Sequence, residues 1–228
     1  MRVAVLFSGG KDSNYALLKA KEAGHEISCL VSMLSDNEES YMFQTANVHM
    51  TALQSDAIGI PLIQRKTRGQ KEDELADMKD ALIEAKERFA IEGVVTGALK
   101  SVYQASRVQK ICHEVDLWCF NPIWLKDQVQ HLHDLIKLGF KVLISGVFAF
   151  PLDERYLGKV MDEEMVRKFE ELQQKYLINP AGEGGEIETT VLDAPFFNQR
   201  IEIIDAVKKW EENSGTYIIK EAKLVPKQ

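Results

Sequence analysis

The first 150 residues alternate between short apolar runs and longer segments whose apolar residues recur at helical spacing. The apolar runs end in glycine or small polar residues, which is typical of buried parallel strands. The clearest helical pattern has Leu75, Met78, Leu82 and Phe89 on one face. The predicted strands are 1–7, 27–34, 61–63, 93–97 and 140–148, and the predicted helices are 13–23, 43–58, 71–90, 102–115 and 126–138. This alternation predicts an α/β fold, a Rossmann-like parallel sheet flanked by helices.

The pattern changes after residue 150. One more helix is predicted over 159–176, followed by a loop rich in glycine and glutamate. Two β-prone runs, 200–210 and 216–225, flank a polar turn and predict a hairpin. We therefore expect a smaller C-terminal α+β lobe. The expected division is 1–150 and 151–228.

The segment after the first predicted strand has the composition of a phosphate-binding loop. Its residues are Ser8, Gly9, Gly10, Lys11, Asp12 and Ser13. Two glycines allow a ligand to approach the backbone closely, and the free N–H groups of the next helix point into the same loop. Lysine adds a positive charge and the serines add hydroxyl donors. The spacing matches neither the common P-loop nor the dinucleotide fingerprint. An ordinary capped glycine turn is the simpler alternative. Such a turn does not require serine, glycine, lysine and aspartate together, so it leaves this combination unexplained.

A second candidate group lies in the predicted loop 179–189. It contains Gly182, Glu183, Gly184, Gly185, Glu186 and Glu188. The glycines permit backbone angles that other residues avoid. The carboxylates are expected to face a small volume, where they repel one another unless a cation, a metal or a donor-rich ligand lies among them. A solvated acidic loop is the alternative.

A third group follows the strand predicted over 93–97. It comprises Thr96, Gly97, Ala98, Ser101, Tyr103, Gln104 and Arg107. Polar groups at the start of a helix are well placed to reach a nucleotide α-phosphate or an acceptor carboxylate. A capped helix with a surface arginine explains the same residues equally well.

Composition and charge restrict the partners. The net charge of −7 argues against a nucleic-acid partner. No apolar run is long enough to span a bilayer, and the N-terminus has no secretory leader, so we expect a cytoplasmic location and no membrane partner. The three cysteines form no zinc pattern, and the five histidines form no metal-binding pattern and are interpreted as structural or surface residues. The sequence leaves a homo-oligomer open.

Taken together, the three groups resemble the diphthine–ammonia ligase family of the N-type ATP pyrophosphatases, the PP-loop or adenine nucleotide alpha hydrolase superfamily. The first loop alone fits any member of that superfamily, whereas the glycine–glutamate segment from Gly182 to Thr189 distinguishes this family. The resemblance implies an ATP-dependent ligase that amidates diphthine on translation elongation factor 2 to diphthamide. It implies ammonia as the nitrogen source, an acyl-adenylate intermediate, and release of AMP and pyrophosphate. It also implies that 1–150 binds ATP and that 151–228 binds the acceptor.

The same resemblance suggests roles for individual residues. It places ATP against Phe7, Ser8, Gly9, Gly10, Lys11, Asp12, Ser13, Met33 and Gly97, with Mg²⁺ at Asp12. It assigns the acceptor to Tyr103, Gln104, Arg107, Glu183, Gly184, Gly185, Glu186, Glu188 and Thr189. Lys11, Asp12 and Glu186 are the expected catalytic residues.

Two other functions remain open at this point. One is a tRNA-modifying ATP pyrophosphatase similar to the thiolases, for which Cys29, Cys112 and Cys119 are candidate reactive residues. The other is a non-catalytic nucleotide-binding protein with a similar sheet, which binds ATP without forming AMP.

Overall fold

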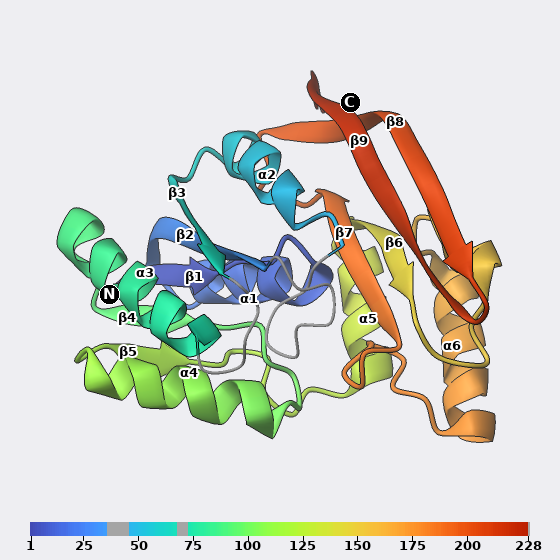
Figure 1. Ribbon diagram of the computed structural model, residues 1–228, viewed down its shortest axis with the longest axis horizontal. Helices are drawn as coiled ribbons and strands as arrows, with labels where there is room; N and C mark the ends of the chain where they lie inside the picture. Colours follow the sequence, from blue (N-terminus) through green and yellow to red (C-terminus); the bar gives the residue numbers. More distant parts are fainter. Residues whose placement is uncertain (36–45, 68–72, 228) are drawn as a thin grey trace.

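The centre of the protein is a parallel sheet, seen in a computed structural model that describes residues 1–35, 46–67 and 73–227. Its strands are β1 (Arg2–Leu6), β2 (Glu26–Ser35), β3 (Leu62–Thr67), β4 (Gly93–Val95) and β5 (Trp118–Phe120). The strand order is β3-β2-β1-β4-β5, and all neighbouring pairs are parallel (Figure 1). The order reverses between β1 and β4, so their carboxyl ends form the switch point at which such sheets bind ligands. The predicted Rossmann-like fold is confirmed.

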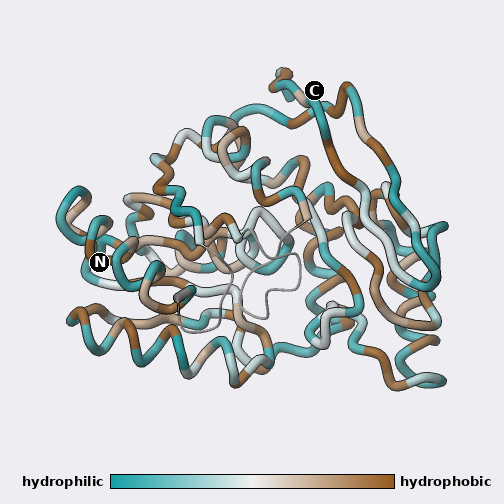
Figure 2. The backbone as a smooth tube through the Cα atoms, in the orientation of Figure 1, coloured by the Kyte–Doolittle hydropathy of each residue, from teal (hydrophilic) through white to brown (hydrophobic). Residues whose placement is uncertain are grey.

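Helices cover both faces of this sheet. They are α1 (Lys11–Glu22), α3 (Asp73–Phe89) and α4 (Val102–Glu114), with α2 (Thr51–Ile58) after a short 3₁₀ turn, η1 (Val48–Met50). Side chains alternate across a strand, so Val3 and Val5 of β1 pack with α1, whereas Ala4 packs with α3 and α4 on the other face. Figure 2 shows α4 alternating between hydrophobic and hydrophilic positions, as expected for a helix with one buried face.

The rest of the described chain forms an antiparallel sheet and its helices. The strands are β6 (Lys141–Val147), β7 (Ile187–Asp193), β8 (Gln199–Glu211) and β9 (Ser214–Pro226), in the order β7-β6-β9-β8. The helices are α5 (Gln128–Lys137) and α6 (Glu163–Tyr176), with a 3₁₀ turn, η2 (Glu154–Tyr156), between β6 and α6. Strands β8 and β9 form a long hairpin on the outside of the molecule (Figure 1). The predicted C-terminal α+β lobe and its hairpin are confirmed.

Three predictions about single elements are corrected. The run at 140–148, expected as the fifth parallel strand, is β6 and pairs antiparallel with β7 and β9. The fifth parallel strand is β5, which is too short for a periodic pattern. The loop expected over 179–189 ends early, because β7 begins at Ile187. The helix expected over 43–58 is shorter, because α2 begins only at Thr51 after the 3₁₀ turn η1, and residues 43–45 lie outside the described residues.

One hydrophobic core connects the two sheets. Leu17 of α1, Leu135 of α5, Ile144 of β6 and Phe169 of α6 are almost completely buried in the same cluster. The chain changes from one sheet to the other between β5 and β6. The division at residue 150 stays a prediction.

The shared core leads to a test by mutation. Leu135 is 0% exposed, so Leu135→Ala should lower the free energy of unfolding by about 2–5 kcal/mol through lost burial and the resulting cavity. Leu138 at the end of the same helix is 37% exposed, so Leu138→Ala should cost about 1 kcal/mol or less. Urea unfolding followed by fluorescence and circular dichroism measures both values. Because the core is shared, we expect one transition, and two separate transitions would contradict this.

Candidate functional site

A cavity of about 810 Å³ opens at the switch point of the parallel sheet. Three segments that are far apart in the sequence line it, namely the loops after β1 and β4 and the loop that leads into β7. The predicted site residues among its lining are Phe7, Ser8, Lys11, Asp12, Ser13, Met33, Gly97, Tyr103, Gln104, Glu183, Gly184, Gly185, Glu188 and Thr189. The cavity therefore brings together all three groups found in the sequence. Gly9, Gly10, Arg107 and Glu186 are not among the described lining residues.

The loop after β1 is fixed by its contact with α2 and β7. Gly9 has φ of +78°, and a Cβ there would lie 2.4 Å from Oε1 of Gln54, so this position requires glycine. The buried Gln54 side chain donates from Nε2 to the carbonyls of Gly9 at 2.9 Å and Val191 at 2.7 Å. This amide holds the turn against the second sheet.

The loop after β4 packs directly on the first turn of α1. A Cβ on Gly97 would lie 2.7 Å from the backbone nitrogen of Ser13 and 2.8 Å from the carbonyl carbon of Asp12. Backbone atoms cannot yield without moving the helix, so this position also requires glycine. Since α1 begins at Lys11, two residues earlier than predicted, the N–H groups at its N-terminus lie at this junction.

Lys11 is a buried cation between the two halves of the site. Its side chain is 3% exposed, and Nζ donates to Oδ2 of Asp12 at 2.8 Å and to the carbonyl of Ala181. Its backbone N–H donates to Oγ1 of Thr189 at 3.1 Å. Lys11 thus connects the glycine-rich loop to the acidic loop and to β7.

Asp12 has a second partner that the sequence did not indicate. Its Oδ1 lies 2.8 Å from Nε2 of His131, a residue of α5 that is 0% exposed. Burial alone would raise the pKa of the Asp12 carboxyl, but Lys11 and His131 outweigh it and hold the pKa below its ordinary value. The sequence indicated only a structural or surface role for His131, because 119 residues separate it from Asp12 and no short spacing connects them.

Glu183, in the loop that leads into β7, lies against the start of α4. Its Oε2 accepts hydrogen bonds from the backbone N–H groups of Lys100 at 2.8 Å and Ser101 at 3.1 Å. A carboxylate is favourable at a helix N-terminus. Burial, and secondly the charge of Asp12, nevertheless raise the pKa of Glu183 above its ordinary value. Asp12 and Glu183 are therefore two carboxylates with opposite pKa shifts in one cavity.

The three glutamates do not all face one volume, which corrects the expectation from the sequence. Glu186 is 8% exposed, and its carboxylate accepts from Asn179 N at 2.9 Å, Asn179 Nδ2 at 2.7 Å and Gly184 N at 2.8 Å. Glu186 therefore orders the loop from within. It is not among the described residues that line the cavity, where the expected catalytic and acceptor-binding role would place it. Glu188 is on β7 and lines the cavity, and its Oε2 accepts from Ala46 N at 2.8 Å.

Arg107 also differs from the expectation that it contacts a ligand. Its guanidinium lies 3.4 Å from the ring centroid of Tyr103, and Nη1 donates to the Tyr103 carbonyl at 3.3 Å. Tyr103 and Gln104 line the cavity, so Arg107 supports the wall that they form.

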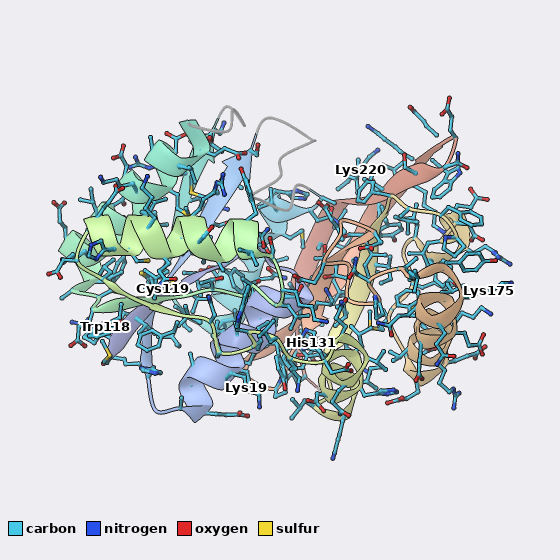
Figure 3. The ribbon with its side chains drawn as sticks, turned by 90° about the horizontal axis from the view of Figure 1, so that it is seen from below. Lys19, Trp118, Cys119, His131, Lys175 and Lys220 are labelled. Carbon is cyan, nitrogen blue, oxygen red and sulfur yellow. The ribbon has the colours of Figure 1, made fainter. Side chains whose placement is uncertain are left out.

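The cysteines lie away from this site. None of the described residues that line the cavity is a cysteine. Burial raises the pKa of the Cys29 thiol to about 12, and a hydrogen bond that the Cys112 thiol donates to Cys119, together with burial, raises the pKa of Cys112. The same hydrogen bond lowers the pKa of Cys119. Figure 3 shows Cys119 beside Trp118 at the outer end of the parallel-sheet half, whereas His131 lies at the junction with the other half. Cys29 and Cys112, whose pKa values are raised, are therefore poor nucleophiles, and Cys119 is not among the described residues that line the cavity.

Within residues 1–35, 46–67 and 73–227, no cluster of three or more histidine, cysteine, aspartate or glutamate side chains has the arrangement of a metal site. Mg²⁺ often takes only one or two carboxylates when phosphates complete its shell, and Asp12 fits that need. None of the helices in these ranges combines the length and apolar character that crossing a bilayer requires.

Fold and site together define a Rossmann-like α/β protein with a glycine-rich loop at the switch point of its sheet, a class that includes many nucleotide-binding enzymes. Residues 1–118 match the diphthamide synthase N-terminal domain, and residues 127–225 match the diphthamide synthase C-terminal domain. The chain belongs to the diphthamide synthase family. The resemblance stated from the sequence is confirmed, and the protein is an enzyme of a ligase family.

Individual relatives agree with this assignment. A Homo sapiens protein named diphthine–ammonia ligase is 36% identical over 225 residues, which cover 90% of this chain and 84% of that protein. A Danio rerio protein of the same name is 36% identical over 226 residues, which cover 91% and 88%. A solved structure of a predicted tRNA methyltransferase subunit from Methanocaldococcus jannaschii covers 85% of this chain and 98% of its own, at 18% identity and a TM-score of 0.45. That similarity is too distant to support an inference.

The raised pKa of Glu183 predicts a pH effect on stability. The folded state holds this proton more tightly, so the stabilising contribution is complete below the ordinary pKa of 4.5 and is lost as pH rises through the folded-state value. Glu183→Gln cannot ionise and still accepts from both N–H groups. We expect the variant to gain stability over the native chain as pH rises above 4.5, measured by urea unfolding at several pH values.

The control for this prediction is Glu171→Gln. Glu171 is exposed on α6, and a hydrogen bond from Lys168 lowers its pKa, so this variant should show no such gain. A difference between Glu183→Gln and the native chain that stays constant with pH would contradict the assignment.

Proposed function

We propose that this chain catalyses the ATP-dependent amidation of diphthine on translation elongation factor 2 to diphthamide. Ammonia supplies the nitrogen, and AMP and pyrophosphate are released. One observation carries the proposal: the glycine-rich loop, the loop after β4 and the glycine–glutamate loop line a single cavity. An adenylating ligase needs this arrangement, because the nucleotide and the carboxylate that it activates must react within one site.

The first step that we propose is adenylation of the acceptor. A diphthine carboxylate oxygen attacks the α-phosphorus of ATP, the bond from that phosphorus to the bridging oxygen breaks, and pyrophosphate leaves with the electron pair. The N–H groups at the start of α1 and the ammonium group of Lys11 are suited to hold the departing phosphates. Phe7 and Met33 line the same cavity and are proposed to flank the adenine.

Asp12 is the proposed ligand for Mg²⁺. Its lowered pKa keeps it ionised, and its side chain is 26% exposed beside the cavity. The metal ion would neutralise phosphate charge during the first step. The chain's own contribution is to hold this carboxylate in place between Lys11 and His131.

The second proposed step forms the amide. The nitrogen of ammonia attacks the acyl carbon, the tetrahedral adduct collapses, and AMP leaves with the electron pair of the acyl C–O bond. The nitrogen loses a proton, for which Glu183 is the proposed acceptor, because a carboxylate with a raised pKa is a stronger base.

Diphthine also carries a quaternary ammonium group. Glu188 and Tyr103 line the cavity and offer a carboxylate and an aromatic ring to such a cation. We propose them, with Gln104, Gly184, Gly185 and Thr189, as the acceptor side of the site. Glu186 and Arg107 are proposed to support this wall from behind.

The other functions considered from the sequence have less support. A thiolase mechanism needs a reactive cysteine at the nucleotide, and the cysteines lie outside the described cavity lining. A non-catalytic nucleotide-binding protein needs no second loop of buried and cavity-facing glutamates. A cytoplasmic location and a homo-oligomer stay predictions.

The activity itself is tested with the whole chain, ATP, Mg²⁺, ammonium and elongation factor 2 that carries diphthine. We expect AMP and amide in equal amounts, measured by chromatography and by mass spectrometry of the modified peptide. ATP binding without AMP formation would support the non-catalytic alternative. Sulfur transfer to tRNA would support the thiolase alternative.

The role of the buried cation predicts a large effect of Lys11→Met. Loss of a charge that stabilises the transition state should lower kcat by about 10²–10³-fold in the same assay. Lys19→Met is the matched control, since Lys19 lies on the same helix but pairs with Glu22 at the surface. Unchanged kcat in Lys11→Met, with folding confirmed by circular dichroism, would refute the role. Alanine at each cysteine should leave turnover intact.

A further inference from the structure

Helix α5 contributes two buried polar side chains to the two loops of the site, although it belongs to the half of the chain with the antiparallel sheet. Gln128 accepts from Ala181 N at 3.1 Å and donates to Asn179 Oδ1 at 3.1 Å, so it holds the acidic loop. His131, one turn later, contacts Asp12 in the glycine-rich loop at 2.8 Å. Asp127 fixes the start of the helix by accepting from Gln130 N at 2.9 Å.

The surroundings of His131 leave it one polar contact. Its side chain is 0% exposed, and Nδ1 has no hydrogen-bond partner within the described part of the chain. The ring of Tyr15 packs edge-on against it, with 4.9 Å between the ring centroids. An apolar ring would fit such a place without the cost of burying a polar group. What the imidazole adds is therefore its hydrogen bond to Asp12.

This bond completes the fixation of the Asp12 carboxylate. Oδ1 faces His131 and Oδ2 faces Lys11 Nζ, so each oxygen has a buried partner. The carboxylate can then rotate only if one of these bonds breaks. Lys11 Nζ in turn donates to the carbonyl of Ala181, and the N–H of Ala181 donates to Oε1 of Gln128. The position of both charged groups relative to the cavity thus depends on α5.

We propose that His131 is a positioning residue that orients Asp12, and through it Lys11, toward the phosphates of the nucleotide. The inference rests on the proposed nucleotide site. It does not depend on the identity of the acceptor. Removal of a buried hydrogen bond to a charged group should weaken binding of Mg²⁺ and a non-hydrolysable ATP analogue about 10- to 100-fold.

The test compares His131→Phe and His131→Gln. Phenylalanine keeps the ring against Tyr15 but has no donor, whereas the glutamine amide can still donate to Asp12. We expect His131→Phe to lose affinity for the analogue in calorimetry, and His131→Gln to recover most of it. In turnover, the KM for ATP should rise while the KM for the acceptor stays near that of the native chain.

His133 provides the matched control. It lies on the same helix and pairs with Glu163 at 2.8 Å, but this pair is exposed at the surface. His133→Phe and His133→Gln should bind the analogue as the native chain does. Loss of affinity in these variants equal to that in His131→Phe would mean that any change in α5 disturbs the site, and would overturn the specific role.

A double-mutant cycle separates positioning from a general structural role. If His131 acts through Asp12, then His131→Phe should cause no further loss of affinity in an Asp12→Asn background. Additive losses, or native affinity in His131→Phe, would overturn the inference. If His131→Phe does not fold, His131→Leu, which also lacks a donor, takes its place in the same cycle. A native chain that binds no nucleotide would instead refute the proposed function.

Discussion

The ammonium group of Lys11 lies almost completely out of water, and the arrangement of the site depends on how its charge is balanced. Moving a charge into a protein interior costs several kcal/mol unless it is paired and hydrogen-bonded. The side chain of Lys11 donates to the Asp12 carboxylate and the Ala181 carbonyl, and its backbone N–H donates to Oγ1 of Thr189. These partners come from loops of both sheets. The loops must therefore be in place together, which explains why three distant segments share one cavity.

Charged groups of both signs border the cavity. The positive end of α1, Lys11, Glu183 and Glu188 all border the cavity. Asp12, which also lines it, is kept ionised by Lys11 and His131, and its charge contributes to the raised pKa of Glu183. Such a site suits a reaction in which a polyanion and a substrate with a positive group must lie close together. Residues that do not reach the cavity still shape it, as Glu186 does for the acidic loop and Arg107 for Tyr103.

Much of the fold was predictable because strands and helices impose different periods on the sequence. Val3, Ala4 and Val5 form part of a continuous apolar run, which is typical of a strand buried on both faces, and the structure divides them between the two cores. The errors came from features that have no period. β5 has three residues, too few to repeat, and β6 follows a helix as a parallel strand would but pairs with β7 and β9. The sequence of a strand does not specify which other strand it pairs with.

The sequence by itself determined the local chemistry: the glycine-rich loop, the helix that follows it, the glycine–glutamate segment and the family to which they belong. These are properties of neighbouring residues, so their spacing can be read along the chain. The direction of each side chain was decided by the tertiary structure. The packing of α5 brought His131 to Asp12 across 119 residues. Hydrogen bonds within the acidic loop turned Glu186 inward, while Glu188 of β7 lines the cavity. Such contacts depend on how whole helices and strands pack, and no short stretch of sequence specifies that.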